Sequence, residues 1–541
     1  MDPLASLFKN KIVVLLMNLF IQIGYTGAQH FEWLRHYPSQ YSFNPAMVGG
    51  ALCLMPGGVA NVRLDSFALT YNQDAFGSLI LENRDNSGNV LWEISLSNKV
   101  FVKRIVADQN GNIYLGGGFM DTLDFNGSNP LMNSGSGLNV DRFLAKLDAN
   151  GSVIWKRNLR LTHAQTYLED LQLDNQGNLW YAMNDFNNSA LYKVDINGDD
   201  TDSLIQEGVL LVSSFSFDPF GNLFIAGAAS NGTVTFGNQS YPVAFSYTKF
   251  IGRYDNLHNA TWAYFAEDIT FQESKIVSDQ YGNAYMGGII YDRTDFGTLH
   301  FLAPQWSNDM FLLKVDSVGN FLWGKSNPSG SAPFTGRFTP TSNEFIDVDL
   351  FGNVYIAGRS AGVLDWGNSV VMTAGLGQPH ENRISVVSFD GNGNARWGKI
   401  FGSESYNALH TLKVSDTGEC FFNAGFRDIS VFDSTTFIGN SFINFVIGKI
   451  SSVGPSNVHE INNLDLTIFP NPSDGLIRFI SEIQELQLDI FDLMGRLILS
   501  SRINTGMTFD TGNLPDGAYL IRLRNGDRLA NHVWIKGGAA N

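Results

Sequence analysis

Three polar side chains in one acidic segment have the spacing of a calcium-binding loop. In DINGDDTDSLIQ (195–206), Asp195, Asn197 and Asp199 occupy positions 1, 3 and 5 of that pattern, where carboxylate and amide oxygens can converge on Ca²⁺. Position 6 is an aspartate instead of glycine, and position 12 is a glutamine instead of glutamate. An acidic, solvated hairpin turn is the alternative interpretation, and no other metal or cofactor is expected.

Signatures of catalysis are missing from the sequence. It has no H-E-x-x-H zinc motif and no G-x-S-x-G nucleophile elbow, and its 9 histidines lack metal-ligand spacing. GNFLWGKS (319–326) satisfies the P-loop pattern, but a phosphate cradle needs a loop between a strand and a helix, whereas this segment belongs to a repeated strand. The sequence therefore favours a non-enzymatic protein, although a site built from one residue per repeat would leave no motif.

Composition indicates an all-β protein and argues against nucleic acid or anionic lipid as its main partner. The net charge of −17 disfavours nucleic acid and anionic lipid as partners. Hydrophobic residues make up 44% and charged residues 16%, with 55 glycines and 41 phenylalanines, as is typical of many short strands joined by tight turns. Two cysteines, Cys53 and Cys420, cannot form a disulfide framework, and we expect both to be buried free thiols.

The first 28 residues have the pattern of a signal peptide. Two lysines lie before or at the start of the apolar run 12–23, and Thr26, Gly27 and Ala28 supply the small residues of a cleavage site. The run is shorter than the ~20 residues that span a bilayer, so a membrane anchor is the weaker alternative. We expect cleavage after Ala28 and a mature chain without a transmembrane segment.

Two turn-centred segments recur along residues 85–425. In the first, a tryptophan follows an aspartate by seven residues; the aspartates are Asp85, Asp148, Asp255, Asp316 and Asp390. The second has the form D-x-x-G-N or a looser version of it, at 108–117, 174–183, 218–227, 279–288, 349–358 and 416–425. Aspartate suits the start of an Asx-type turn, and glycine accepts a positive φ. Both segments therefore predict a strand, a turn and a returning strand.

The repeat predicts a β-propeller closed by its two ends. Third elements such as LDFNG (123–127) and LDWGN (364–368) close several units, which gives about four strands per unit of ~60 residues. KISSVG (449–454) matches the first half of a unit, and HFEW (30–33) supplies the missing tryptophan strand. Six internal units and one split unit predict a seven-bladed propeller over residues 29–454. The repeated tryptophans are expected to pack between blades, whereas Trp306 and Trp366 lie outside the repeat and are candidates for exposed contacts.

These segments resemble the secreted bacterial β-propeller repeat families. DRFLAKLDANG (141–151), DMFLLKVDSVG (309–319) and DLFGNVYIAG (349–358) carry the resemblance. It implies the propeller fold only, because such propellers have unrelated functions.

The C-terminal segment predicts a separate small domain. Residues 455–463 are polar and lack the repeat, so they predict a linker. Alternating strands broken by Pro-Asn-Pro and Pro-Asp-Gly turns then predict an Ig-like β-sandwich over 464–541.

This segment also resembles the C-terminal sorting domain of type IX secretion cargo. The matching positions are Pro470, Asn471, Pro472, Gly475, Asp492, Gly495, Arg496, Gly517, Tyr519 and Lys536. The resemblance implies that residues 464–541 are recognised by the type IX secretion machinery. It also implies passage through the periplasm and across the outer membrane, and a secreted or cell-surface location.

Three functions are compatible with these patterns. The first is a non-enzymatic propeller that binds a glycan or a protein, with the C-terminal domain acting in delivery. The second is a secreted hydrolase or lyase that acts on polysaccharide or peptide, with acidic residues of different blades meeting at the channel. The third is a structural adhesin.

Overall fold

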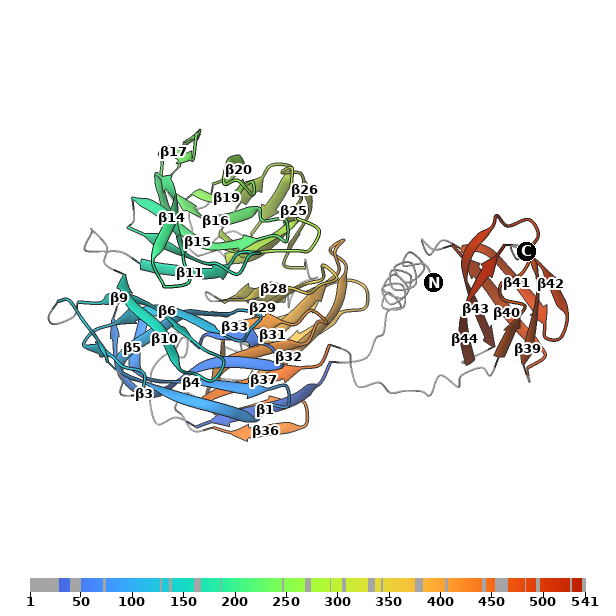
Figure 1. Cartoon of the computed structure of the whole chain (residues 1–541), viewed down its shortest axis with the longest axis horizontal. Helices are drawn as coiled ribbons and strands as arrows, with labels where there is room; N and C mark the ends of the chain where they lie inside the picture. Colours follow the sequence, from blue (N-terminus) through green and yellow to red (C-terminus); the bar gives the residue numbers. More distant parts are fainter. Residues whose placement is uncertain are drawn as a thin grey trace. The chain divides into compact units, whose positions relative to one another are not determined.

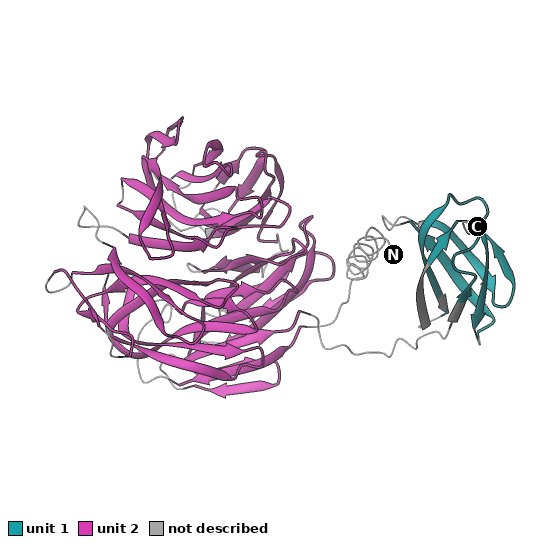
Figure 2. Cartoon of the chain, in the orientation of Figure 1, with its two compact units in different colours: residues 1–28, 453–541 teal, residues 29–452 magenta. Residues whose placement is uncertain are grey.

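All regular structure in the described part of the chain is β-strand. The computed structural model describes residues 29–38, 50–71, 74–126, 129–135, 139–159, 167–185, 187–245, 248–267, 274–291, 293–303, 308–328, 336–341, 344–374, 383–403, 407–439, 444–452, 466–481, 483–492, 497–525 and 528–537. The predicted signal peptide with Ala28, the linker 455–463, Trp306, Gly495 and Arg496 lie outside these residues. The chain divides into two compact units, residues 29–452 and a C-terminal unit described from residue 466 (Figure 2).

Residues 29–452 form four-stranded antiparallel meanders, which we number modules I to VII (Figure 1). Module I contains β2 (Leu52–Met55), β3 (Gly58–Tyr71), β4 (Asp74–Asp85) and the first half of β5 (Val90–Ala107). Module II contains the second half of β5, β6 (Ile113–Phe119), β9 (Asp141–Leu147) and β10 (Val153–Leu159). Module III contains β11 (Tyr167–Leu173), β12 (Leu179–Asn184), β13 (Asn188–Val194) and β14 (Asp200–Glu207). Module IV contains β15 (Val209–Phe217), β16 (Leu223–Ala229), β19 (Thr248–Tyr254) and β20 (Ala260–Ala266).

The remaining modules repeat this order. Module V contains β21 (Lys275–Ser278), β22 (Ala284–Tyr291), β25 (Asn308–Val315) and β26 (Phe321–Ser326). Module VI contains β28 (Ile346–Val348), β29 (Val354–Asp365), β31 (Arg383–Phe389) and β32 (Ala395–Ser403). Module VII contains β33 (Asn407–Val414), β34 (Cys420–Phe426), β37 (Asn444–Ile450) and, as its last strand, β1 (Phe31–Tyr37). The strand with Trp33 thus pairs with β37, as expected from the sequence (Figure 1).

The third sequence elements form additional hairpins instead of module strands. They are inserted between the second and third strands of a module, as β7 (Thr122–Leu123) with β8 (Leu131–Met132), β17 (Gly232–Phe236) with β18 (Gln239–Val243), β23 (Arg293–Phe296) with β24 (Leu299–Leu302), and β35 (Ile429–Phe432) with β36 (Thr435–Ile438). In module VI, β30 (Val371–Ala374) pairs with the end of β29, and β27 (Arg337–Pro340) pairs with its middle. Two of the hairpins bridge modules, because β17 pairs with β14 and β35 pairs with β32. Trp366 lies in one of these insertions and is buried against Phe338 and Phe389, so the prediction of an exposed Trp366 is wrong.

The core lies between the modules. The second strands β6, β16 and β34 are buried at every residue, as expected for strands that are covered on both faces. The first strands also contact one another in order: β2 contacts β5, followed by β11, β15, β21, β28 and β33, and β33 contacts β2. Cys53 lies in β2 and Cys420 in β34, and both are buried free thiols. They lie in a first and a second strand of neighbouring modules, and the expectation that both are buried free thiols is confirmed.

The repeated turns are closed by their first aspartate. In the turn 108–112, Oδ1 of Asp108 accepts hydrogen bonds from the backbone N–H groups of Asn110 and Asn112, both at 2.9 Å, and the Asn112 amide donates to Oδ2 at 2.7 Å. Gly111 has φ +79°, which favours glycine. Equivalent aspartate contacts close the turns that begin at Asp85, Asp148, Asp174, Asp195, Asp218, Asp255, Asp279, Asp316, Asp349 and Asp390. These turns join the first two or the last two strands of a module, so they lie at one edge of the meanders.

The repeated tryptophans join consecutive modules. Five of them donate from the indole Nε1 to the carbonyl of the second turn residue in the next module: Trp33 to Asn86, Trp92 to Ala149, Trp155 to Ile196, Trp262 to Ser317 and Trp323 to Gly391. The distances run from 2.8 to 3.2 Å. The Nε1 of Trp397 is buried without a hydrogen-bond partner among the described residues, and its ring packs on Tyr355. The expectation that these residues pack between modules is confirmed.

The C-terminal unit consists of two sheets that share one core. One sheet contains β38 (Leu466–Phe469), β39 (Leu476–Ser481) and β42 (Thr508–Asp510); the other contains β40 (Glu485–Phe491), β41 (Leu497–Asn504), β43 (Gly517–Asn525) and β44 (Arg528–Lys536). Phe479, Leu488, Ile521 and Trp534 are fully buried between them. Within the described residues, no helix has the length and apolar character that crossing a membrane requires.

Candidate functional site

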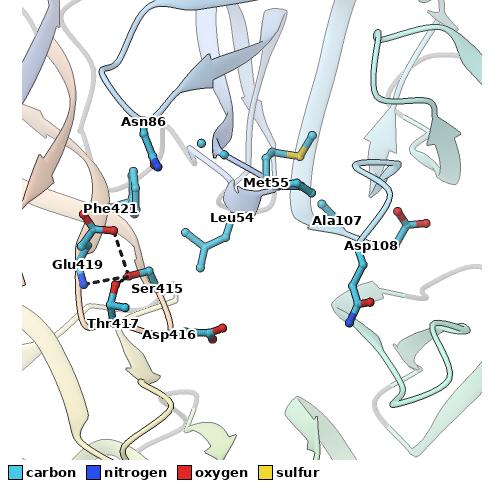
Figure 3. A pocket seen from close by; sticks show the side chains of 14 residues that line it. Leu54, Met55, Asn86, Ala107, Asp108, Ser415, Asp416, Thr417, Glu419 and Phe421 are labelled. Atoms are coloured by element: carbon cyan, nitrogen blue, oxygen red, sulfur yellow. Dashed lines mark hydrogen bonds between the residues drawn. The ribbon is translucent and has the colours of Figure 1, made fainter. Parts of the chain in front are cut away.

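Module I differs from its neighbours in its first turn, and this difference creates a pocket. Where other modules have a five-residue turn, β2 and β3 are joined by the two residues Pro56 and Gly57. The short turn leaves a hollow of about 550 Å³ beside the longer turns of modules VII and II (Figure 3). Its walls are formed by residues 54–58, 107–109 and 415–417, together with Asn86, Glu419 and Phe421.

The pocket combines an apolar wall with polar groups that the fold does not use. Leu54, Met55 and Phe421 supply the apolar wall (Figure 3). Among the described residues, the side chains of Asn86, Gln109 and Asp416 make no hydrogen bond or ion pair within the chain. A few available polar groups over an apolar wall are typical of ligand pockets.

The other polar side chains at the pocket already make hydrogen bonds or ion pairs within the chain. The carboxylate of Glu419 lies 2.5 Å from the ammonium of Lys449, and the Ser415 hydroxyl accepts a hydrogen bond from the backbone N–H of Glu419. Asp108 is occupied by its own turn. The available groups therefore come from three modules: Asn86 from module I, Gln109 from module II and Asp416 from module VII.

A second group of polar residues lies on the first strands. Arg104 of β5 contacts Asp170 of β11 at 3.0 Å and Glu344 at 3.4 Å, and Lys413 of β33 contacts Glu344 at 2.7 Å. Register shifts interrupt these strands next to Arg104 and Asp170, and again beside His410. Such bulges redirect side chains out of the regular alternation.

Each acid of this group is engaged. Burial favours a raised pKa for Glu344, but the charges of Arg104 and Lys413 outweigh it and hold the pKa below its usual range. Asp170 accepts hydrogen bonds from the backbone N–H groups of Leu171 and Phe215. Asp347 accepts from Val348 and Val414, and its burial raises its pKa to about 6. Acidic residues of different modules do lie close together here, as a catalytic interpretation requires. Their carboxylates are already bound, however, either by the basic side chains Arg104 and Lys413 or by backbone N–H groups.

The candidate calcium residues lie in the last turn of module III. Oδ1 of Asp195 accepts from the backbone N–H groups of Asn197 and Asp199, at 2.9 and 2.8 Å, and the Asn197 amide donates to Oδ2 at 3.2 Å. The segment thus has the repeated turn geometry. In the described part of the chain, no group of three or more His, Cys, Asp or Glu side chains is placed to hold a metal ion. Calcium binding stays a prediction, which melting temperatures in Ca²⁺ and in chelator would test.

Several of the predicted sorting residues meet at one end of the C-terminal unit. Asn471 Oδ1 accepts from the backbone N–H of Ile535 at 2.9 Å, and the carbonyl of Gly475 accepts from the N–H and the hydroxyl of Thr511. The ammonium of the buried Lys536 donates to the carbonyls of residues 511, 512 and 514. Residues 470–475, 511–514 and 535–536 are thus joined by hydrogen bonds, with Lys536 as an internal donor.

Tyr519 extends this cluster towards Asp492. Its hydroxyl donates to the carbonyl of Pro515 at 2.7 Å, and its ring packs on Trp534. Burial, followed by the charges of Asp516 and Asp492, raises the pKa of Tyr519. Pro470, Asn471 and Pro472 are exposed, whereas Gly475, Tyr519 and Lys536 are buried or half-buried. The sequence identified these residues without indicating which of them face solvent.

Comparisons with known proteins identify the C-terminal unit. Residues 467–536 match the family model described as secretion system C-terminal sorting domain. No curated protein matches the chain. The chain is similar to solved structures of virginiamycin B lyase from Staphylococcus aureus (9% identity, 77% of this chain and 99% of that chain, TM-score 0.39) and of a protein from Lactobacillus plantarum (12%, 66% and 88%, 0.34). The match over 467–536, at the cluster of Asn471 and Lys536, shows that this segment is a type IX secretion sorting domain and that the chain is a secreted or cell-surface protein.

Proposed function

We propose that modules I to VII are the seven blades of one closed β-propeller. The pairing of β1 with β37 and the contacts of the first strands, which lead from β2 through β33 and back to β2, support this arrangement. A sheet completed by both chain ends also removes the exposed edge strands that favour aggregation. The resemblance to secreted bacterial propeller repeats is part of this proposal.

The propeller is proposed to be a non-enzymatic binding module that the sorting domain delivers to the cell surface or the medium. The observation that carries this function is the pocket between modules VII, I and II, where Asn86, Gln109 and Asp416 are left available by the fold. Amide and carboxylate groups beside an apolar wall suit a hydroxyl-rich ligand, because they bind hydroxyl groups while the wall covers its C–H faces. A glycan is therefore the favoured ligand, and a polar peptide is the alternative.

Catalysis is the second candidate. It requires a free acid and a free base near the channel, whereas Asp170, Glu344 and Asp347 are engaged by bases or by backbone N–H groups. Asp416 is the acid at the pocket whose side chain is available, and one carboxylate does not supply the pair that glycoside hydrolysis uses. A structural adhesin without a small ligand is the third candidate.

Binding and product formation measured together test these candidates. The chain from Gln29 is incubated with a panel of neutral, acidic and basic oligosaccharides and with peptides, and both retention and product masses are recorded. We expect retention without new products, and a loss of about tenfold or more in affinity for Asn86→Ala and Asp416→Asn. New products would establish the catalytic candidate. Retention that both variants leave unchanged would remove the pocket from the proposal.

Delivery has its own test. The chain without residues 464–541 is expected to remain in the periplasm, because it lacks the sorting domain. Undiminished protein in the medium would contradict this role.

A further inference from the structure

The third residue of the repeated turns has no structural reason to be apolar. Its backbone N–H donates to the first aspartate whatever the side chain is. Where the side chain also contacts the turn, as Asn197 does with Asp195, it is a polar one. Most turns accordingly have a polar residue there: Ser87, Asn110, Asn150, Gln176, Asn197, Asn392 and Thr417. Five turns have a large apolar residue instead: Phe220, Leu257, Tyr281, Val318 and Phe351.

The five apolar positions fall in three consecutive modules. Phe220 and Leu257 belong to module IV, Tyr281 and Val318 to module V, and Phe351 to module VI. Phe220 is 58%, Leu257 77%, Tyr281 61% and Val318 71% exposed, and Phe351 is half-buried. Exposed large apolar side chains that gather in one sector mark an interaction surface more often than scattered ones do.

Contacts between turns show that Phe220, Tyr281 and Phe351 lie in adjacent turns. A Cβ at Gly282, in the turn of Tyr281, would lie 3.4 Å from the ring of Phe220. A Cβ at Gly352, beside Phe351, would lie 3.4 Å from the ring of Tyr281. The amide of Gln280 also donates to the carbonyl of Leu350, which links the turns of modules V and VI. Phe220, Tyr281 and Phe351, with Leu257 and Val318 in the second turns of modules IV and V, are called the apolar arc.

The chemistry around the arc favours a protein partner over a sugar. The neighbouring amides are occupied by their own turns: Asn222, Asn259, Asn283 and Asn353 each donate to the first aspartate. A hydroxyl-rich ligand would find few groups to bind, and Leu257 and Val318 have no ring on which a sugar can stack. An apolar protein surface needs neither, because burial of these side chains itself supplies the driving force.

The charge of the chain indicates the rest of the partner's surface. The net charge is −17, and the turns of the arc each begin with an aspartate. Asp279 and Asp349 face Lys314 and Arg396, at 3.6 and 3.9 Å. Asp255 and Asp316 make no ion pair with the described residues, so they carry the negative charge of the arc. Complementary charge speeds association and excludes like-charged partners. We propose that the apolar arc is a docking surface for a protein segment with apolar residues flanked by lysine or arginine. This site is separate from the pocket and does not rest on its ligand.

Defined peptides provide the test. The chain from Gln29 is titrated with short synthetic peptides that combine leucine with lysine, leucine with glutamate, or serine with lysine, at near-physiological salt of about 0.15 M. Neutral oligosaccharides are titrated in parallel. We expect only the leucine–lysine peptide to bind. The double variants Phe220→Ser/Tyr281→Asn and Leu257→Asn/Val318→Ser should each weaken binding about tenfold or more.

Matched controls separate the arc from non-specific attraction and from the pocket. Asn150→Ser and Asn392→Ser change the same turn position outside the arc, and Asp416→Asn changes the pocket; all three should bind the peptide like the parent chain. The arc variants introduce residue types found at this position in other turns, so melting temperatures should stay close to that of the parent.

Three outcomes would overturn the proposal. The first is that no peptide binds. The second is peptide binding that the arc variants leave unchanged. The third is oligosaccharide binding that is sensitive to Tyr281→Asn and insensitive to Leu257→Asn/Val318→Ser, because that pattern indicates a stacking platform for sugars.

Discussion

Asp202 Oδ2 lies 3.6 Å from Nδ1 of His258, in the one described junction where this pair stands in place of a tryptophan and a glycine. In the neighbouring junction, Trp262 donates to the turn that begins at Asp316, and its ring lies against Gly319. Asp202 occupies the tryptophan position of module III, and His258, with φ +63°, occupies the glycine position of module IV. Both positions of this junction thus differ from those of the other junctions. The contact between Asp202 and His258 replaces a tryptophan ring that packs on a glycine.

The pair predicts coupled effects of substitution. Asp202→Trp alone should place an indole against the His258 ring, and His258→Gly alone should leave Asp202 without its partner. The double variant should rebuild the contact of the other junctions, so the two changes should be non-additive by about 1–2 kcal/mol in the free energy of unfolding. Denaturant unfolding of the parent, both single variants and the double variant measures this coupling. Additive effects would show that the two positions do not form one junction.

Gly88, on which the Trp33 ring packs, predicts that an alanine there destabilises the fold for two reasons that can be measured separately. Gly88 has φ +77°, and a Cβ there would lie 2.5 Å from the Trp33 ring; Gly177 has φ +81° in a turn of the same type, with nothing within 4 Å. Gly177→Ala should cost about 1–2 kcal/mol of stability from the left-handed backbone alone. Gly88→Ala should cost about 1–3 kcal/mol more, because the methyl group displaces Trp33. Urea unfolding measures both variants, and equal costs would mean that Trp33 moves aside freely.

The repeated turns could be predicted from sequence because their geometry depends on neighbouring residues only. Asp108, Gly111 and Asn112 define their turn by local hydrogen bonds, and the spacing to Trp155 or Trp323 records a contact with the next module. The pairing of the Trp33 strand with β37 could also be predicted. Residues 449–454 match the first half of a repeat unit that lacks its tryptophan strand, and residues 30–33 supply such a strand.

The pocket and the ion pairs could not be predicted in this way. Asn86, Gln109 and Asp416 are polar turn residues like many others, and only the packing of modules VII, I and II makes them neighbours. Glu344 and Arg104 are 240 residues apart in the sequence, and no motif records their contact. The two-residue turn at Pro56 was the available signal, because it breaks the repeat.

Buried His410 predicts a loss of stability in acid. Burial lowers the pKa of His410 to about 4, and its ring stacks on Phe445. The unfolded chain takes up this proton near pH 6.5, whereas the folded chain resists it until about pH 4. The folded state should therefore lose about 3 kcal/mol from this group as the pH falls from 6.5 to 4, with no effect above 6.5.

Variants of His410 isolate this contribution. His410→Phe keeps a ring against Phe445 and cannot be protonated, so the unfolding free energy of the parent relative to that of this variant should fall by about 3 kcal/mol between pH 7 and pH 4. Asp347 contributes with the opposite sign in both proteins, because its folded pKa of about 6 lies above the ordinary 3.8 and favours proton uptake by the folded state. Denaturant unfolding across this range gives both profiles, with His410→Leu as a second variant. Parallel profiles would contradict a buried, neutral His410.

Lys536 predicts a folding requirement within the sorting domain. Its ammonium donates to three backbone carbonyls, those of Thr511, Gly512 and Leu514, so removal of the charge leaves one buried and two partly buried acceptors without this donor. Lys536→Met should destabilise the domain by about 2 kcal/mol or more and reduce the amount of protein outside the cell. Ile535→Thr changes a side chain that is 46% exposed and should leave export unchanged. Immunoblots of periplasm, outer membrane and medium, with melting curves of each purified variant, measure both effects. A Lys536→Met protein that is destabilised yet exported at the parent level would show that the machinery does not require this cluster, whereas a stable protein that is retained would make Lys536 itself a contact.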